Sequence, residues 1–420
     1  MKAESKPRPP SNLRVLMLSW EFPPRIVGGL ARHVGELSLA MAKQGVEVDV
    51  LTAHVHGIPQ TEQLWPQKGS RQPGRLSVHR NLPEAIHPVD FVSSIHQLNF
   101  GLLQQYLALP RSFDIIHGHD WLVAQASWTL KHGTGAPLIG TIHATEHGRQ
   151  NGIHTPLQSY INANEWLLTY ESARAICCSQ YMANEVAQVH ATPREKLRVI
   201  PNGIDPTRLQ VPAEEKAGLA DFRRRWAAPE EKIVLFVGRM VREKGAQILI
   251  DAAPRVLAGW RNTRFIIVGG GWTGHLASQA AARGVAHRVN FAGFVSEADL
   301  CRLYAVADVA VFPSLYEPFG IVALEAMAAG VPVITSDIGG FREVVKTGVT
   351  GLHTWANNAD SLAWGILEVL RKPEEAAQRA RNARREVKLR FSWESVAEQT
   401  LGIYRDALST PPRKQGSAST

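Results

Sequence analysis

The run Arg14-Val15-Leu16-Met17-Leu18 decides the fold class, because its apolar residues follow one another without the alternation of a half-exposed strand. A strand of this composition is buried on both faces, which is typical of a parallel sheet covered by helices. Helical periodicity follows over 30–43, and a second apolar strand follows over 47–52. This order predicts a βαβ unit at the start of the chain.

The same alternation of strand and helix continues along the chain. In the first half we expect strands at 114–117, 137–141 and 175–178, and helices over 121–131 and 181–189. In the second half we expect strands at 232–237, 264–268, 309–312 and 333–335, and helices over 246–257, 296–305, 321–328 and 361–370. Because 420 residues exceed what one core usually supports, the sequence predicts an α/β fold with two Rossmann-like, doubly wound parallel-sheet domains.

The run Val199-Ile200-Pro201-Asn202-Gly203-Ile204-Asp205-Pro206 interrupts the periodicity and marks a hinge near residue 203. This divides the chain into a first domain over 13–203 and a second over 204–388. A helical segment over 389–408 is expected to pack back on the first domain. The ends, 1–12 and 409–420, are rich in polar residues and proline and are expected to be disordered tails.

Composition narrows the class of protein. Lys and Arg number 46 against 38 Asp and Glu, but the cations form no basic stripe, so we expect no nucleic-acid partner. Three cysteines, Cys177, Cys178 and Cys301, have neither disulfide nor zinc spacing, which favours a reducing compartment. The start of the chain does not resemble a signal peptide, and no apolar run reaches the ~18 residues of a membrane span. We therefore expect a cytoplasmic protein without a transmembrane segment, and the sequence leaves its oligomeric state open.

The stretch Glu317-Pro318-Phe319-Gly320-Ile321-Val322-Ala323-Leu324-Glu325 is the strongest indication of function. It sets one carboxylate on a loop and a second about two turns into the helix that follows. A helix start offers unpaired N–H groups to a diphosphate, here around Phe319, Gly320 and Ile321. We interpret Glu317 as the acid on the sugar side and Glu325 as the acid on the ribose side of a nucleotide sugar. A solvated helix start with two unrelated glutamates is the alternative.

Two cationic side chains follow the first predicted strand of the second half. Arg239 and Lys244 stand five residues apart in a loop that opens a helix, so both could reach one diphosphate. Taken singly, Arg239 and Lys244 would more often be surface cations, and Arg242, in the same loop, is interpreted as one. Earlier in the chain, Gly28 and Gly29 precede a helix and could let backbone approach a phosphate or sugar.

Two further candidates follow strands of the first half. His143 comes directly after the strand at 137–141 and its neighbour Ile142, and Asp120 follows His117-Gly118-His119. Both could bind a sugar, although a lone histidine is more often a structural group. His117 and His119 could in principle bind a metal, but no Asp-x-Asp pair accompanies them, so we predict no metal site.

Taken together, these segments resemble retaining glycosyltransferases of family 4, and the first half is most similar to the bacterial glycogen synthase and α-1,4-glucosyltransferase members. The likeness covers about residues 14–405. The motifs that carry it are Ser19-Trp20-Glu21-Phe22-Pro23-Pro24 with Gly28-Gly29-Leu30, His117-Gly118-His119-Asp120-Trp121, Thr141-Ile142-His143-Ala144-Thr145-Glu146, Asn202-Gly203-Ile204-Asp205, Gly238-Arg239 with Lys244, and Glu317 with Glu325.

The resemblance implies the GT-B fold, in which two Rossmann-like domains face each other across a cleft. It implies transfer of a sugar, most simply glucose, from ADP-glucose, UDP-glucose or a GDP-sugar to an α-glucan or maltooligosaccharide. The reaction would retain the anomeric configuration and need no metal and no further cofactor. Carried over to this sequence, the residues with implied roles are Arg239 and Lys244 on the diphosphate, Glu317 on the sugar hydroxyls, Glu325 on the ribose, His143 and Asp120 on the reacting sugar, and Gly29 near the phosphate.

Four alternatives stay open. Val27 stands where glucan synthases often carry a basic residue, which keeps a lipid or small-molecule acceptor open. A sugar-nucleotide 2-epimerase would share the architecture but need no acceptor. A phosphorylase or a pure binding protein would differ in whether a nucleoside diphosphate is released.

Overall fold

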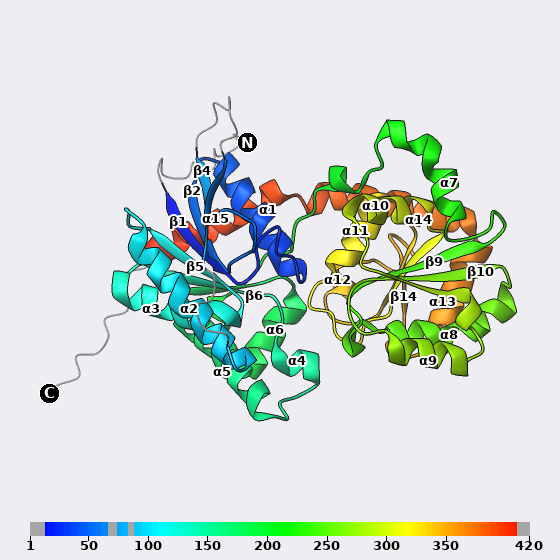
Figure 1. The fold of residues 1–420 in the computed structure, drawn as a ribbon, viewed down its shortest axis with the longest axis horizontal. Coiled ribbons are helices and arrows are strands. Elements are labelled where there is room, and N and C mark those ends of the chain that lie inside the picture. The colour runs from blue at the N-terminus through cyan, green and yellow to red at the C-terminus, as the bar shows by residue number, and fades with distance from the viewer. Residues whose placement is uncertain (1–12, 66–73, 83–87, 410–420) are drawn as a thin grey trace, which may run out of the picture. The chain divides into compact units, whose positions relative to one another are not determined.

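The computed structural model describes residues 13–65, 74–82 and 88–409. The predicted tails over 1–12 and 409–420 lie outside the described residues, apart from Ser409. The described chain forms two compact units (Figure 1). The first unit comprises the residues up to Cys178, Met182–Gly203 and the residues from Trp393 on, and the second comprises Ser179–Tyr181 and Ile204–Ser392. Within these described ranges, no helix is both long and apolar enough to cross a membrane.

The first unit is built on an eight-stranded sheet with the order β3-β4-β2-β1-β5-β6-β7-β8. Neighbouring strands are parallel, except that β3 is antiparallel to β4. Buried apolar runs form its centre, as expected for a sheet covered on both faces. Its strands are β1 (Arg14–Ser19), β2 (Glu47–Thr52), β3 (Thr61–Trp65), β4 (Arg75–Arg80), β5 (Ile115–His119), β6 (Leu138–Ile142), β7 (Arg174–Cys177) and β8 (Leu197–Val199).

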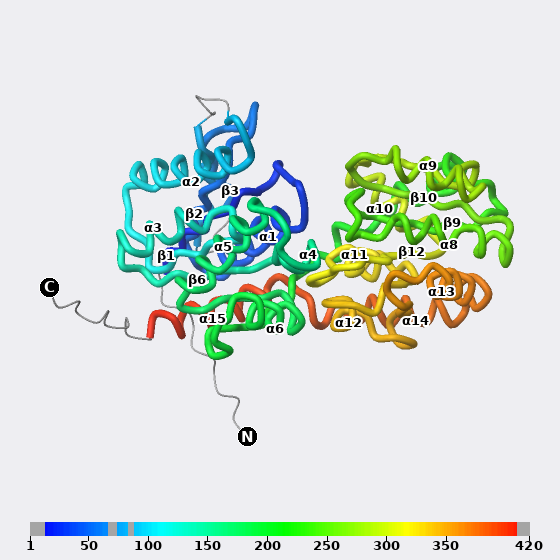
Figure 2. The backbone as a smooth tube through the Cα atoms, turned by 90° about the horizontal axis from the view of Figure 1, so that it is seen from below, coloured from blue at the N-terminus to red at the C-terminus, as the bar shows by residue number. Residues whose placement is uncertain are grey.

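Helices cover both faces of this sheet, with α1 and α15 on one face and α2, α3 and α5 on the other (Figures 1 and 2). Val15 and Met17 of β1 share a buried cluster with residues of α1 and α15. Local signals fix the helix starts: Thr155 forms a capping box with Gln158 ahead of α5. The helices are α1 (Gly29–Lys43), α2 (Phe91–Ala108), α3 (Ala124–Thr134), α4 (Glu146–Gln150), α5 (Pro156–Glu171), α6 (Gln180–Val189) and α15 (Trp393–Ser409).

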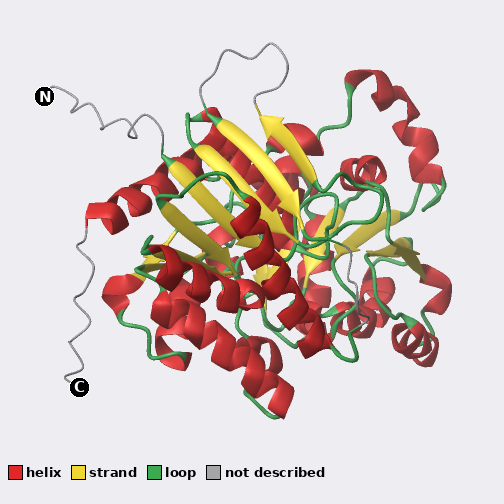
Figure 3. Ribbon diagram, turned by 60° about the vertical axis from the view of Figure 1, so that its left-hand side comes forward, coloured by secondary structure: helices red, strands yellow, loops and turns green. Residues whose placement is uncertain are grey.

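The second unit has a six-stranded parallel sheet with the order β11-β10-β9-β12-β13-β14. The strands, yellow in Figure 3, are β9 (Lys232–Val237), β10 (Thr263–Val268), β11 (Val289–Gly293), β12 (Val309–Phe312), β13 (Val333–Ser336) and β14 (Leu352–Thr354). Helices α8, α9 and α13 cover one face, and α10, α11 and α14 cover the other (Figure 1).

The helices of the second unit are α7 (Leu219–Arg224), α8 (Ala246–Gly259), α9 (Gly274–Ala282), α10 (Glu297–Val306), α11 (Ile321–Ala329), α12 (Phe341–Val344), α13 (Ala359–Arg371) and α14 (Pro373–Arg390). Two parallel-sheet units confirm the predicted α/β class. In each unit the strand order reverses beside the first strand, so the carboxyl ends of the central strands are where such sheets bind ligands.

Candidate active site

The carboxyl ends of β5 and β6 bring together polar residues of the first unit. The register places His119 of β5 beside Ser19 of β1 and Thr141 of β6. Asp120 follows β5 and donates its backbone N–H to the Thr141 carbonyl at 2.9 Å. His143 is the first residue after β6. Both sequence-predicted residues therefore stand at neighbouring strand ends.

Three histidines gather at this edge. His33 of α1, which the sequence does not single out, joins His119 and His143, and one ring nitrogen of each lies within 4.8 Å of the others. His33 Nδ1 is 2.7 Å from Asn202 Oδ1, while His33 Nε2 is buried without a hydrogen-bond partner. His119 Nδ1 and His143 Nε2 are 3.4 Å apart. The cluster could hold a transition metal or bind hydroxyl groups.

Burial keeps these imidazoles neutral. It lowers the pKa of His33 from 6.5 to about 4, although the hydrogen bond to Asn202 opposes the shift. Burial, helped by the neighbouring imidazoles, lowers the pKa values of His119 and His143 well below 6.5. A neutral imidazole has one donor and one acceptor nitrogen, which suits a sugar hydroxyl better than a phosphate.

Asp120 has an unusual position for a carboxylate. Its backbone adopts φ 67°, a conformation that few non-glycine residues occupy. Burial raises the pKa of Asp120 to about 7, against the opposing charge of Arg149, whose Nη2 lies 3.9 Å from Oδ2. The other oxygen, Oδ1, is buried without a partner in the described structure. An unfilled, strained acceptor of this kind is typical of a ligand site.

Glu165 of α5 supports the loop that carries His143. Its Oε1 accepts the backbone N–H of Glu146, the first residue of α4, at 2.8 Å. Burial raises the pKa of Glu165 to about 8 and lowers that of His190, whose Nε2 is 3.5 Å from Glu165 Oε2, to about 4. Both side chains are therefore neutral near pH 7. No sequence motif points to this pair, which lies 25 positions apart in the printed sequence.

The stability of the protein is expected to fall as the pH drops from 6.5 to 5. Unfolding takes up protons in this window, because five buried histidines have folded pKa values below their ordinary 6.5. Each raises the free energy of unfolding by roughly 1.4 kcal/mol per pH unit as the pH increases toward 6.5. These histidines are His33, His117, His119, His143 and His190.

Asp120 and Glu165 act in the opposite direction. Their folded pKa values of about 7 and 8 exceed the ordinary 3.8 and 4.5, so they lower the free energy of unfolding as the pH rises through that window. Below pH 6.5 the free energy of unfolding rises with pH, because the effect of the five histidines exceeds that of the two acids. Above pH 6.5 only the acids titrate, and they lower it, so maximal stability is expected near pH 6.5 to 7. Melting temperatures followed by circular dichroism from pH 5 to 8 test this. Equal values at pH 5 and 6.5 would contradict it.

The glycine loop before α1 is held by an internal carboxylate. Glu21 Oε2 accepts the N–H groups of Val27 at 2.8 Å and of Gly28 at 2.9 Å. A phosphate could reach the Gly28 N–H only by displacing Glu21. Gly29 is the exposed first residue of α1, which has no side-chain cap. Of the two predicted glycines, Gly29 is therefore the one that can receive a ligand without rearrangement.

In the second unit, Lys244 and Glu317 lie side by side. Lys244 closes the short 3₁₀ turn Arg242–Lys244 after β9, and its Nζ donates to Glu317 Oε2 at 2.8 Å. Ser314 Oγ donates to the same oxygen at 3.3 Å. Only 6% of Glu317 is exposed. The structure thus joins two residues that the sequence placed in separate motifs.

Arg239 is not part of this pair. Its side chain is half exposed, and Nη2 lies 3.3 Å from Glu243 Oε1 in the same loop. An exposed pair of this kind contributes little to stability. Arg239 can therefore exchange Glu243 for a phosphate at small cost.

The start of α11 is a bare helix N-terminus. Gly320 precedes it with φ 105°, and a Cβ there would lie 2.5 Å from the Phe341 ring, so only glycine fits. No side chain caps the helix, and its first N–H groups, beginning at Ile321, have no acceptor within the helix. Phe319 is buried against the Phe391 ring, with centroids 6.1 Å apart. Phe319 is therefore a packing residue whose backbone, not its side chain, leads into the helix.

Glu325 lies just over one turn into α11, because the helix begins at Ile321. The sequence placed it about two turns in. Its side chain is 5% exposed, and Tyr304 OH donates to Oε2 at 3.4 Å. The carboxyl group is thus held inside the unit, beside the same helix that offers its N-terminus.

The polar strand ends and the bare helix start are typical of nucleotide-sugar enzymes, and comparison with known proteins agrees. The model for Glycosyltransferase Family 4 matches residues 27–208, and that for Glycosyl transferases group 1 matches residues 220–386. An uncharacterised glycosyltransferase of Methanocaldococcus jannaschii is 37% identical over 405 residues, covering 94% of this chain and 99% of the relative. A glycogen synthase of Mycobacterium tuberculosis is 35% identical over 417 residues, covering 93% and 94%.

A solved structure, a sucrose-phosphate synthase from Thermosynechococcus elongatus, matches with a TM-score of 0.79 and 25% identity, covering 94% of this chain and 98% of that one. The fold and the site define a glycosyltransferase with the GT-B fold. The chain belongs to glycosyltransferase family 4.

Proposed function

We propose that this glycosyltransferase transfers glucose from a nucleoside-diphosphate glucose to an α-glucan or maltooligosaccharide, with retention of configuration and without a metal. One observation carries the donor assignment: Lys244 and Glu317 form an ion pair beyond the carboxyl ends of β9 and β12, and Glu317 lies in the segment that leads to the bare start of α11. The acceptor assignment is supported by the near full-length likeness to a glycogen synthase.

The donor would use both charges of this pair. Lys244 has three donor hydrogens, so it can keep its bond to Glu317 and also bind a phosphate oxygen. Arg239 and the first N–H groups of α11 would bind the remaining oxygens. Glu317 would accept hydrogen bonds from sugar hydroxyls, and Glu325 from the ribose. Base recognition is left open between ADP, UDP and GDP.

The chemical step needs charge stabilisation at the leaving group. The bond from the anomeric carbon to the β-phosphate oxygen breaks, a new bond to the acceptor oxygen forms on the same face, and the departing phosphate takes the acceptor proton. Lys244 and Arg239 would stabilise the negative charge that grows on the phosphate. His143 and Asp120 of the first unit would bind hydroxyls of the reacting sugar, with the neutral His33 and His119 beside them.

A release assay tests the proposal. The purified protein is incubated with ADP-, UDP- or GDP-glucose, with and without glycogen or maltose, and the free nucleoside diphosphate is measured. We expect release that depends on the glucan, and an α-linked product from the α-linked donor by proton NMR. Release that is independent of any acceptor, or conversion of the donor sugar without release, would contradict the proposal and favour a hydrolase or an epimerase.

A small-molecule acceptor is the second candidate. It is favoured by the structural likeness to a sucrose-phosphate synthase, which spans 94% of this chain. The same assay separates the two: phosphorylated and free monosaccharides would then stimulate release where glycogen does not. A lipid acceptor would require the same test with detergent-dispersed lipid.

Chelation is expected to leave turnover unchanged. The proposed diphosphate site already carries two cations, Lys244 and Arg239, so no divalent ion is needed to neutralise the leaving group. Initial rates are compared before and after incubation with EDTA. Because His33, His119 and His143 could bind a transition metal, the protein is also assayed for bound zinc. Loss of activity that a divalent ion restores would show that the reaction depends on a metal.

A further inference from the structure

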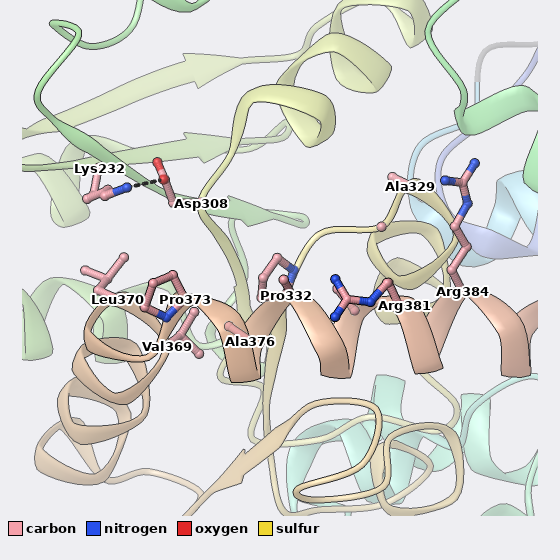
Figure 4. A pocket seen from close by; sticks show the side chains of 13 residues that line it. Lys232, Asp308, Ala329, Pro332, Val369, Leu370, Pro373, Ala376, Arg381 and Arg384 are labelled. Carbon is pink, nitrogen blue, oxygen red and sulfur yellow. Dashed lines mark hydrogen bonds and ion pairs between the residues drawn. The ribbon is translucent and has the colours of Figure 1, made fainter.

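A cavity of about 370 Å³ lies in the second unit, away from the candidate donor residues (Figure 4). It opens at the amino ends of three neighbouring strands: Lys232 begins β9, Asp308 precedes β12, and Pro332 precedes β13. Lys244 and Glu317 follow the carboxyl ends of β9 and β12. Since the four residues of β12 alone span ~13 Å, the cavity and the donor residues occupy opposite edges of the sheet.

One wall of the cavity is apolar. It is formed where the end of α13 meets the start of α14, and its residues are Val369, Leu370, Pro373, Ala376 and Ala380. A volume of this size is within the range of small-molecule sites, which combine apolar walls with a few polar groups. The wall therefore suits the carbon skeleton of a small ligand.

The charged lining has an excess of cations. The described residues that line the cavity include three cations, Lys232, Arg381 and Arg384, and one carboxylate, that of Asp308. The charge of Asp308 is already neutralised by two ion pairs, because Lys232 Nζ lies 2.9 Å from its Oδ1 and Arg223 Nη2 lies 3.0 Å from its Oδ2. The two arginines on α14 are thus left without a neutralising partner at the cavity.

The hydrogen bonds of Arg381 and Arg384 also leave both positive charges without a carboxylate partner among the described residues. Arg381 donates to the neutral amide oxygen of Gln378. Arg384 forms no hydrogen bond or ion pair with any residue in the described ranges, and its Nε is buried without a partner. A buried donor that lacks an acceptor is costly, so we expect water or a ligand to supply one to Arg384.

The two arginines are neighbours on α14, because they are three residues apart. Figure 4 shows the Arg384 side chain extending away from the helix and the Arg381 side chain running along it toward Pro332, so the long, flexible Arg381 side chain would turn toward Arg384 to share an anion. Two guanidinium forks can each give parallel hydrogen bonds to a phosphate group. A doubly charged phosphate would also balance the two uncompensated cations.

We propose that this cavity binds a small organic phosphate, with the phosphate on Arg381 and Arg384 and the carbon skeleton against the apolar wall. The site is separate from the donor site and does not depend on the identity of the glycosyl acceptor.

Calorimetric titration of the full-length protein with glycerol 3-phosphate tests the site. Wild-type protein is expected to bind it at millimolar concentration and to bind inorganic phosphate more weakly, because the latter makes no contact with the apolar wall. Arg384→Gln should raise the dissociation constant about tenfold or more, since it removes charged hydrogen bonds. Arg385→Gln is the matched control, because the adjacent, exposed Arg385 does not line the cavity, and it should change binding less than twofold.

A second control separates this cavity from the donor site. Lys244→Met should leave glycerol 3-phosphate binding unchanged, because Lys244 belongs to the opposite edge of the sheet. No binding by the wild type, equal binding by Arg384→Gln and wild type at matched melting temperatures, or loss of binding in Lys244→Met would each overturn the proposal. Equal affinity for inorganic phosphate and glycerol 3-phosphate would refute the role of the apolar wall and with it the proposed ligand class.

Discussion

Glu317→Gln is expected to lower kcat of glucosyl transfer by about 10²- to 10³-fold, the range found when one preorganised charged or polar contact to a transition state is removed. The amide keeps the shape of the side chain, so residue 317 loses its negative charge but keeps its volume beside Ser314 and Lys244. What disappears is the anionic acceptor that would strengthen as the sugar acquires positive charge. Steady-state release of nucleoside diphosphate under saturating glucan measures the change.

Glu231→Gln is the matched control for this variant. Glu231 is also 6% exposed and also paired with cations, Arg264 and Arg288, but it stands at the amino end of β9. The Glu231→Gln variant should have a lower melting temperature, because its ion pairs are lost, but its kcat should stay within twofold of wild type. If kcat falls by the same factor per degree of lowered melting temperature in both variants, Glu317 has only a structural role.

The fold class was predictable because the central strands are read directly from their apolar runs. Strands such as β1, β9 and β12 are buried on both faces, and their continuous apolar runs predict both the strands and a parallel sheet. The crossover helices α2, α5 and α9 were not predicted, but α1, α3, α6, α8, α10 and α11 follow from periodicity in the same way. For these elements local sequence and tertiary burial agree.

Several elements were missed for a physical reason. Strand β3 lies at the edge of its sheet and is mostly exposed, so its polar composition resembles a loop, and β8 has only three residues. Helix α14 is dominated by charged residues and buries a narrow stripe that includes Ala376, Ala380 and Ala383. A stripe of alanines gives a weak periodic signal, although it packs against α11.

The candidate site was predictable only where chemistry and strand position coincide. His143 and Glu317 were identified because each follows an apolar strand. His33 was not, since it is one residue of an amphipathic helix and acquires its place only when α1 packs on the sheet. The bond from Glu21 to the glycine loop and the support of the His143 loop by Glu165 are likewise contacts in space that no spacing in the chain encodes.

Lys244→Met is expected to lower kcat/KM for the donor by about 10³-fold, with a large part of the loss in KM. The variant removes a cation from the proposed diphosphate site, and it also leaves the Glu317 carboxylate without its 2.8 Å ion pair. An unpaired anion at 6% exposure would repel the incoming diphosphate. Arg242→Met is the matched control, because Arg242 is an exposed cation two residues away in the same turn, and it should change kcat/KM less than threefold.

This double role of Lys244 predicts a non-additive result. In the variant that combines Lys244→Met with Glu317→Gln, the repelling carboxylate is gone, so the donor KM should be lower than in Lys244→Met alone even though kcat stays low. Contacting residues of one charged pair commonly couple in this way. Strictly additive losses would show that the pair seen in the structure is not maintained when the donor binds, and that the two side chains act on the donor independently.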